Sequence, residues 1–237
     1  MTTRNIIYLI NVNNGSYADY TYPLIEQYAE KCNADIAVYD NEVFRAIGAP
    51  HPNFLIFDIM RHFVTTDYNK MLYIDMDIRI LPQSPNIFNE VTKFGMVQDH
   101  KADLWRREAM QGWLDNHHPG MHVTHYFNGG VMVSTKKSIL KLLNVVPEDI
   151  IAFWNTTKDV FPHGYNQNIL NYCIIKSEII FEELPDKWNK VCRKAGPDDY
   201  FIHYVANKTQ IQTGYDKFKD NKCNPDITMT LDTLRYV

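Results

Sequence analysis

Two aspartates, Asp75 and Asp77, interrupt an apolar run that extends from Lys70 to Leu81. Apolar and β-branched residues dominate the run, which is typical of a buried strand. Side chains two positions apart on a strand point to the same face, so the two carboxylates are expected to project together. Neighbouring carboxylates repel each other, and a hard cation such as Mg²⁺ or Mn²⁺ relieves that repulsion. The equally weighted alternative is a strand end with two solvated aspartates that leads into a turn near Pro82.

A second pair of charges lies upstream, in a segment that is otherwise mostly apolar. Asp58 and Arg61 stand three residues apart in an expected helix over residues 53–64. Residues at this spacing share a helix face. The pair therefore forms either an internal salt bridge or a charged couple that faces a polar ligand near the strand 72–77.

The composition is that of a soluble globular protein, with 237 residues, 45% apolar and 22% charged. A net charge of −4 argues against a general nucleic-acid binder. The four cysteines include no C-x-x-C pair, so we expect them to be reduced, as in a cytoplasmic protein. No window approaches 18 apolar residues, and we therefore expect no membrane anchor within this sequence.

Short apolar runs alternate with amphipathic segments, which predicts an α/β domain. Strands are expected at 5–12, 34–39, 70–81, 93–98, 126–134, 179–184, 187–191 and 201–205, and helices at 20–32, 53–64, 136–145, 148–156 and 167–173. Sheets of this kind bind ligands outside the carboxyl ends of their strands. Neither G-x-G-x-x-G nor G-x-x-x-x-G-K-[ST] occurs, so the dinucleotide-binding and P-loop interpretations lack their main support.

Five segments, in order along the chain, resemble the motifs of nucleotide-sugar glycosyltransferases with the GT-A fold. The segments are YNKMLYIDMDIRIL, YFNGGVMVS, YNQNILN, LPDKWN and FIHYVANK. They are similar to the DXD strand, the F-N-x-G-V strand, the D-Q-x-x-L-N helix start, the L-P-x-x-[WY]-N segment and the H-Y-x-x-x-K end of the glycogenin and bacterial galactosyltransferase family. The run FDIMRHF resembles instead the S-D-x-x-R-Y segment of mannosyltransferases and clostridial-toxin glucosyltransferases.

The resemblance covers roughly residues 5–208 and implies a GT-A (Rossmann-like) α/β domain. Its central sheet is expected to be mixed, mostly parallel and flanked by helices. The catalytic domain would take up residues 1–208, and residues 209–237 would form a C-terminal extension that packs on it. The implied activity is hexosyltransferase-type: transfer of a sugar from a UDP-sugar to a glycan, protein or small-molecule acceptor. The location would be the cytoplasm, or the host cytoplasm if a virus encodes the protein.

The resemblance also implies a metal centre. Asp77 would bind the ion directly, Asp75 would contact it through water or hold the ribose, and His203 would be the third protein ligand. Mn²⁺ is expected in preference to Mg²⁺, because imidazole is a softer ligand than carboxylate. Lys208 would meet the diphosphate.

Other matched positions are expected to bind the donor substrate. Asn11, Asn13 and Tyr17 stand where the family's first loop grips the uracil. Asp58 and Arg61 match a pair that holds the donor sugar.

The residues expected around the reacting bond depart in part from the family pattern. Asn128 and Gln167 match residues that line the donor sugar in retaining enzymes, so retention is favoured. Asn166 stands where the family often has an aspartate close to the anomeric carbon. An inverting enzyme would need a carboxylate base, for which Asp99 is the candidate. The glycines that follow Asn128 indicate a close backbone approach or a bulge within the strand.

Four histidines between residues 117 and 125 suggest a zinc site at first sight. Pro119 and Gly120 break the helix that would place His118 and His122 on one face, and no cysteine is nearby. We expect residues 104–125 to form a mobile loop that binds the acceptor instead.

Two alternative functions keep some support. A haloacid-dehalogenase-like phosphatase also ends a strand in D-x-D and uses the first aspartate as its nucleophile. Arg79 occupies the place where that class usually has threonine or valine, and the motif lies far from the N-terminus. The other alternative is a non-catalytic module that binds a nucleotide sugar through a decayed site.

Overall fold

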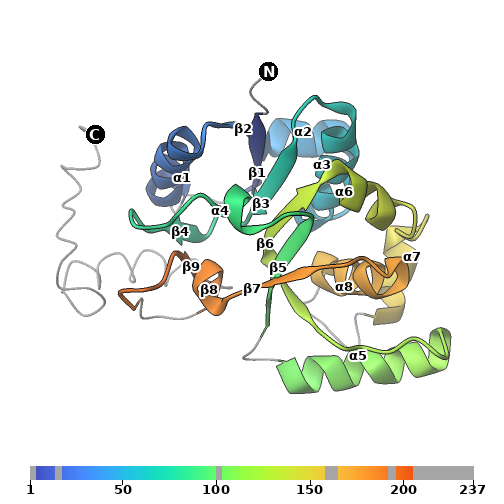
Figure 1. Ribbon diagram of the computed structural model, residues 1–237. Helices are drawn as coiled ribbons and strands as arrows, with labels where there is room; N and C mark the ends of the chain where they lie inside the picture. The colour runs from blue at the N-terminus through green and yellow to red at the C-terminus, as the bar shows by residue number, and fades with distance from the viewer. Residues whose placement is uncertain (1–3, 14–17, 100–102, 158–164, 192–195, 205–237) are drawn as a thin grey trace.

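The structure is a computed structural model that describes residues 4–13, 18–99, 103–157, 165–191 and 196–204 (Figure 1). Its main sheet has six strands in the order β2-β1-β3-β6-β5-β7. Their bounds are β1 Asn5–Asn11, β2 Ala34–Asp40, β3 Lys70–Ile74, β5 Phe94–Gln98, β6 Phe127–Thr135 and β7 Glu182–Leu184. A second sheet has the order β4-β9-β8, formed by β4 Ile78–Ile80, β8 Lys190–Val191 and β9 Phe201–His203.

The main sheet is mixed because one strand runs against the rest. β1 is parallel to β2 and β3, and β5 is parallel to β7, whereas β6 is antiparallel to both of its neighbours. This arrangement confirms the predicted mixed, mostly parallel sheet. Because β1 and β3 run in the same direction, their carboxyl ends lie at the same edge of the sheet.

Helices cover both faces of the main sheet (Figure 1). They are α1 Ala18–Cys32, α2 Asn41–Ile47, α3 Leu55–Thr65, α4 Ile87–Glu90, α5 Asp103–His117, α6 Lys136–Leu143, α7 Ile150–Thr157 and α8 Tyr165–Ser177, with short 3₁₀ helices at Pro52–Phe54 and Asp186–Trp188. Alternate residues of β1 enter two separate cores. Ile6 and Tyr8 pack with α3, α6 and α8, whereas Ile7 and Leu9 pack with α1, α4 and the second sheet.

The predicted continuous strand 70–81 is wrong, because the chain turns between the two aspartates. β3 ends at Ile74, and the Ile78 N–H donates to the Asp75 carbonyl at 3.1 Å, which closes a turn at Met76 and Asp77. The chain then enters β4, which belongs to the second sheet. Met76 is buried and its carbonyl accepts a 2.6 Å hydrogen bond from the Thr21 hydroxyl of α1. The burial of Met76 keeps the apolar pattern unbroken, so the sequence conceals the turn.

Two helices depart from the sequence-based expectations. Residues 103–117 form α5, where a mobile loop was expected, and the helix ends before Pro119 and Gly120. α2 was not predicted, although its capping signals are present in the sequence. The Asp40 side chain accepts from the backbone N–H groups of Glu42 and Val43, and Gly48 ends the helix at φ 70°. None of the helices in the described ranges has both the length and the apolar character needed to span a bilayer.

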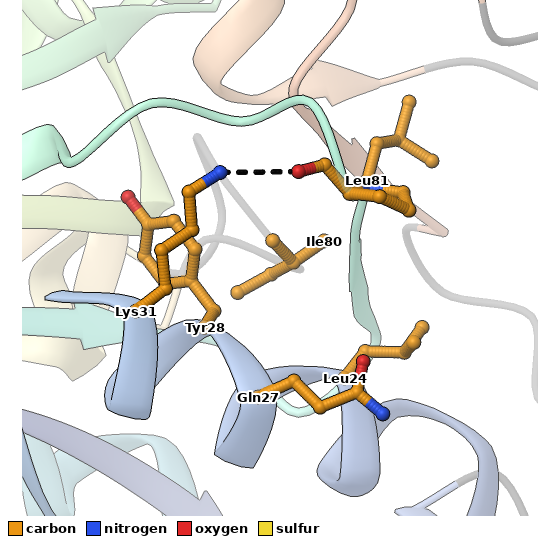
Figure 2. Close-up of a pocket in the computed structure, with 7 residues that line it drawn as sticks. Leu24, Gln27, Tyr28, Lys31, Ile80 and Leu81 are labelled. Atoms are coloured by element: carbon orange, nitrogen blue, oxygen red, sulfur yellow. Dashed lines mark hydrogen bonds between the residues drawn. The ribbon is translucent and has the colours of Figure 1, made fainter. Parts of the chain in front are cut away.

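A hollow of about 180 Å³ lies between α1 and the start of the loop after β4. Figure 2 shows Leu24 and Tyr28 of α1 on one side of it and Ile80 and Leu81 on the other. The Lys31 ammonium donates to two backbone carbonyls of that loop, at 3.1 and 2.7 Å. These two hydrogen bonds join α1 to the loop after β4. The lining of the hollow includes none of the residues expected to bind metal or donor.

The Thr21 hydrogen bond predicts how far α1 supports the turn between the aspartates. Thr21→Val keeps the shape of the side chain but removes the donor to the buried turn, so the free energy of unfolding should fall by about 1–3 kcal/mol in chemical denaturation. The matched control is Thr65→Val on α3, where an exposed hydroxyl donates to the His62 carbonyl at 2.7 Å. That change should stay within about 0.5 kcal/mol. Equal losses in the two variants would contradict this role of Thr21.

Candidate functional site

Three side chains from two distant parts of the chain converge at the carboxyl end of β3. The ligand atoms of Asp75, Asp77 and His203 all lie within 4.8 Å of one another. The Nε2 atom of His203 is 3.5 Å from Asp75 Oδ2 and 3.2 Å from Asp77 Oδ1. β9 brings the histidine there, because it pairs antiparallel with β4 so that His203 lies opposite Ile78. Two carboxylates and an imidazole form a ligand set that suits Mn²⁺ and also accepts Mg²⁺.

The electrostatics of this cluster favour a cation. Burial raises the pKa of Asp75 to about 6, and the neighbouring Asp77 adds to this rise although His203 opposes it. Burial by itself would lower the pKa of His203, but the carboxylates of Asp77 and Asp75 outweigh it, so that this pKa is raised. Both pKa shifts have the same physical meaning: this cluster favours additional positive charge beside the two carboxylates. A divalent ion supplies that charge and would displace the protons.

The backbone of β6 forms one wall of the cluster. The carbonyl of Gly130 accepts from the Asp75 N–H at 2.9 Å. A Cβ atom added to Gly130 would lie 2.3 Å from Cε1 of His203 and 2.7 Å from its Nδ1. The imidazole therefore occupies the space that any other residue type would fill. This is the close backbone approach that the strand glycines predicted.

Two buried asparagines connect this wall to the histidine. The Oδ1 atom of Asn189 lies 2.8 Å from Nδ1 of His203, and its Nδ2 donates to Oδ1 of Asn128 at 2.8 Å. The N–H of Gly130 donates to the same Asn128 oxygen at 2.9 Å. Asn128 was expected to line the donor sugar, whereas Asn189 was not singled out from the sequence. The only signal for Asn189 was its place at the end of the matched segment LPDKWN.

A second polar network links α8 and α5 to β6. Gln167 stands in the first turn of α8, where its Oε1 accepts from the Gly129 N–H at 3.1 Å and its Nε2 donates to Asp99 Oδ2 at 3.1 Å. The same Asp99 oxygen forms an ion pair with Arg106 of α5. The structure therefore brings Gln167, Asp99 and the glycine segment together. Sequence reasoning missed Arg106, because its partner became apparent only once α5 was placed.

Of the remaining donor-binding candidates, Asn11 and Asn13 lie at the edge of the sheet where β1 ends, and Asp58 and Arg61 lie on α3. Asn11 ends β1, beside the end of β3, and Asn13 has φ 57° with its N–H donating to Asn41 Oδ1 at 3.2 Å. Asp58 and Arg61 form an ion pair of 2.9 Å whose side chains are 28% and 52% exposed. The salt bridge considered from the sequence is therefore present, and it is open to solvent.

Several expectations fall outside the part of the chain that the structure describes. These are the roles of Tyr17 and Lys208 and the packing of the extension 209–237. Among the histidines considered for zinc, His117 stacks on Trp113 with ring centroids 4.6 Å apart. His125 stacks on Phe127 at 6.0 Å. These two histidine rings pack against aromatic neighbours.

The close packing of Gly130 on His203 predicts a sharp difference between two adjacent glycines. Gly130→Ala should displace the imidazole and weaken Mn²⁺ binding by about 10-fold or more, as changes that misplace a metal ligand do. Gly129→Ala is the matched control, because the nearest atom to its added Cβ is Cβ of Gln167 at an ordinary 3.6 Å. Titration calorimetry with Mn²⁺ in the presence of UDP measures both. Similar Mn²⁺ affinities in the two variants would refute the proposed histidine position.

No protein-family model matches the sequence, and no curated protein sequence matches it significantly. Solved structures, however, share its fold. A glycosyltransferase involved in the glycosylation of the major capsid of PBCV-1 aligns with TM-score 0.55 and 14% identity, over 90% of this chain and 99% of that chain. Galactosyltransferase LgtC, in complex with donor and acceptor sugar analogs, aligns with TM-score 0.55 and 15% identity, over 90% of this chain and 95% of that chain.

Mouse xyloside xylosyltransferase 1, in its apo form, aligns with TM-score 0.55 and 10% identity, over 87% of this chain and 99% of that chain. At such low identities the likeness is one of fold. These three proteins are named as enzymes that transfer sugars. The chain therefore has the GT-A glycosyltransferase fold.

Proposed function

We propose that this protein is a metal-dependent glycosyltransferase that moves a sugar from a UDP-sugar to a glycan, protein or small-molecule acceptor, with retention at the anomeric carbon. The observation that carries the proposal is the convergence of Asp75, Asp77 and His203 at the carboxyl edge of a GT-A sheet. Ligands of open α/β sheets bind at that edge. The shared fold of three sugar-transferring enzymes supports the same activity class.

Asp75, Asp77 and His203 would hold the divalent ion, with Mn²⁺ preferred because the set includes an imidazole. When bound, such an ion acts as a Lewis acid on the diphosphate oxygens as negative charge grows on them. Asp77 is proposed as the direct ligand. One oxygen of Asp75 accepts from the Tyr73 hydroxyl at 2.5 Å, which leaves Oδ2 to face the ion, a water or the ribose. Lys208 is proposed to bind the diphosphate.

The donor would lie along the carboxyl ends of β1 and β3. Asn11, Asn13 and Tyr17 are proposed to bind the uracil, because the first two stand where β1 ends. The donor sugar would meet the Asp58–Arg61 pair. The Asp58 side chain is 28% exposed and the Arg61 side chain 52% exposed, so both retain surface for sugar hydroxyls. In this proposal the ion pair orients each partner for the ligand.

The network around Gln167 supports retention over inversion. Asp99 is 6% exposed, and its Oδ2 accepts from both Arg106 and Gln167. Such an arrangement holds the Gln167 amide in place and leaves Asp99 poorly placed to act as a base. In a retaining transfer the acceptor oxygen bonds to the anomeric carbon on the face that the diphosphate leaves. The departing diphosphate oxygen can then take the hydroxyl proton, while Gln167 and Asn128 line that face.

Both alternative functions make different predictions. The GT-A fold leaves the phosphatase interpretation without structural support, and that class would also hydrolyse a generic phosphate ester with Mg²⁺. A non-catalytic binding module would bind metal and UDP-sugar but release no free sugar. Slow hydrolysis of a UDP-sugar in the presence of Mn²⁺, measured as UDP release, separates a transferase from both.

Removing Asp77 tests the metal centre. Asp77→Ala should weaken Mn²⁺-dependent UDP binding by about 10-fold or more and abolish UDP-sugar hydrolysis, because the direct ligand is lost. Calorimetry with Mn²⁺ and then with EDTA isolates the metal-dependent part. Glu30→Ala on α1 removes an exposed carboxylate of equal charge and should leave both readouts unchanged. If the unmodified protein bound UDP with equal affinity in Mn²⁺ and in EDTA, the proposed metal dependence would be wrong.

Removing the guanidinium of Arg61 tests the donor-sugar role. Arg61→Met keeps the alkyl stem but loses the charged donors, so affinity for the UDP-sugar should fall by about 10-fold, or about 1.4 kcal/mol, while affinity for UDP stays the same. The control is Arg45→Met, which removes an exposed arginine in the last turn of α2. A parallel loss of UDP and UDP-sugar binding in Arg61→Met would argue against a specific contact with the sugar.

A further inference from the structure

We propose that Asn128 and Asn189 form a relay that fixes the tautomer of His203 and directs its Nε2 lone pair at the metal position. The relay starts at the backbone of β6 and ends at the candidate metal centre. It makes Asn189 a positioning residue, which acts on the ion through the histidine. The inference rests on the proposed metal-dependent transfer and gives Asn189 a role that neither the matched segment LPDKWN nor the comparisons assign to it.

The direction of the relay is set by a group that can only donate a hydrogen bond. The Gly130 N–H lies 2.9 Å from a side-chain atom of Asn128, so that atom must be the amide oxygen. The same oxygen lies 2.8 Å from the amide of Asn189, which must therefore present its NH₂ group. The remaining oxygen of Asn189 then faces Nδ1 of His203 at 2.8 Å. Each amide orientation follows from the previous one.

An oxygen opposite Nδ1 requires the proton of a neutral imidazole to be on Nδ1, which leaves the lone pair on Nε2. That nitrogen faces Asp77 at 3.2 Å and Asp75 at 3.5 Å. A lone pair that faces two carboxylates is repelled unless a cation or a proton lies between them. The relay therefore prepares His203 as a metal ligand before any ion arrives, as hydrogen-bond partners of metal-bound histidines do.

Burial protects the relay from competition with water. Asn128, Asn189 and His203 are 7%, 2% and 5% exposed. Rotation of the Asn128 amide by a half turn would set its NH₂ group against the Gly130 N–H, and the same rotation of Asn189 would set its oxygen against the Asn128 oxygen. Both arrangements are strongly unfavourable. Asn189 is held in place by its chain neighbour Trp188, whose buried ring packs on Phe201 of β9 with centroids 5.2 Å apart. The relay is thus part of a rigid core.

The test reads the tautomer directly in the metal-free, full-length protein. Two-bond ¹H–¹⁵N NMR correlations of labelled histidine, recorded at the alkaline end of a pH titration, show which nitrogen of the neutral ring carries the proton. The His203 signal is identified by its loss in His203→Gln. The unmodified protein should show the proton on Nδ1. A proton on Nε2 would overturn the relay at once.

Asn189→Leu removes the acceptor at nearly constant volume, so the proton should shift toward Nε2 and Mn²⁺ affinity should fall by about 10- to 100-fold. Asn189→Asp offers a carboxylate oxygen to the same Nδ1–H and should restore the Nδ1 tautomer. If Asn189→Leu does not fold, Asn189→Ala removes the same acceptor without introducing the branched leucine side chain. An Asn189→Leu or Asn189→Ala protein that keeps both the Nδ1 proton and its Mn²⁺ affinity would overturn the proposal.

Asn168→Leu is the matched control. It removes an asparagine of α8 that is fully buried and whose Oδ1 accepts from the Tyr126 hydroxyl at 2.7 Å. The loss of a buried amide there should leave the His203 tautomer unchanged. A tautomer shift in Asn168→Leu equal to that in Asn189→Leu would show a general loosening of the core and overturn the specific role of Asn189.

The tautomer measurement is independent of the proposed reaction, because it uses no metal, nucleotide or sugar. Two results together would support the relay and overturn the proposed transferase. They are an Nδ1 proton that shifts to Nε2 in Asn189→Leu and a UDP affinity that does not change when Mn²⁺ is added. Mn²⁺-dependent UDP binding with an Nε2 proton in the unmodified protein would support the transferase and overturn the relay.

Discussion

The contact on which the site depends is the packing of the His203 imidazole against the bare backbone of Gly130. A side chain at that strand position would occupy the space of the ring, since its Cβ would lie 2.3 Å from Cε1 of His203. The same glycine accepts from the Asp75 N–H and donates to Asn128, so one residue positions both a carboxylate and the histidine. The geometry of the candidate metal centre is thereby tied to β6, the antiparallel strand of the sheet.

The site also stands where two sheets meet. The turn at Met76 and Asp77 takes the chain from β3 in the main sheet to β4 in the second sheet, and β9 returns beside β4 with His203 at its end. α1 secures this junction through the Thr21 hydroxyl and the Lys31 ammonium. The candidate metal ligands therefore come from segments that the main sheet, the second sheet and α1 hold together. In this arrangement an ion would cross-link the two sheets.

Much of the sheet could be predicted from apolar runs, and the candidate ligands from five motifs in order, because both signals are local in sequence. The turn between the aspartates could not, since buried Met76 preserves the pattern of a strand and only the distant β9 decides where β4 pairs. Arg106 was missed because its ion pair with Asp99 depends on how α5 docks. Asn189 ends the matched segment LPDKWN, but no role could be given to it until its two hydrogen bonds were seen.

Anomalous diffraction from crystals grown with Mn²⁺ and UDP can show whether Asp75, Asp77 and His203 hold the ion. Data collected at the manganese absorption edge locate the ion without any assumption about activity. We expect one strong anomalous peak between the carboxylates of Asp75 and Asp77 and Nε2 of His203, with the UDP diphosphate beside it. A peak at another place, or UDP bound with no manganese at these three side chains, would contradict it.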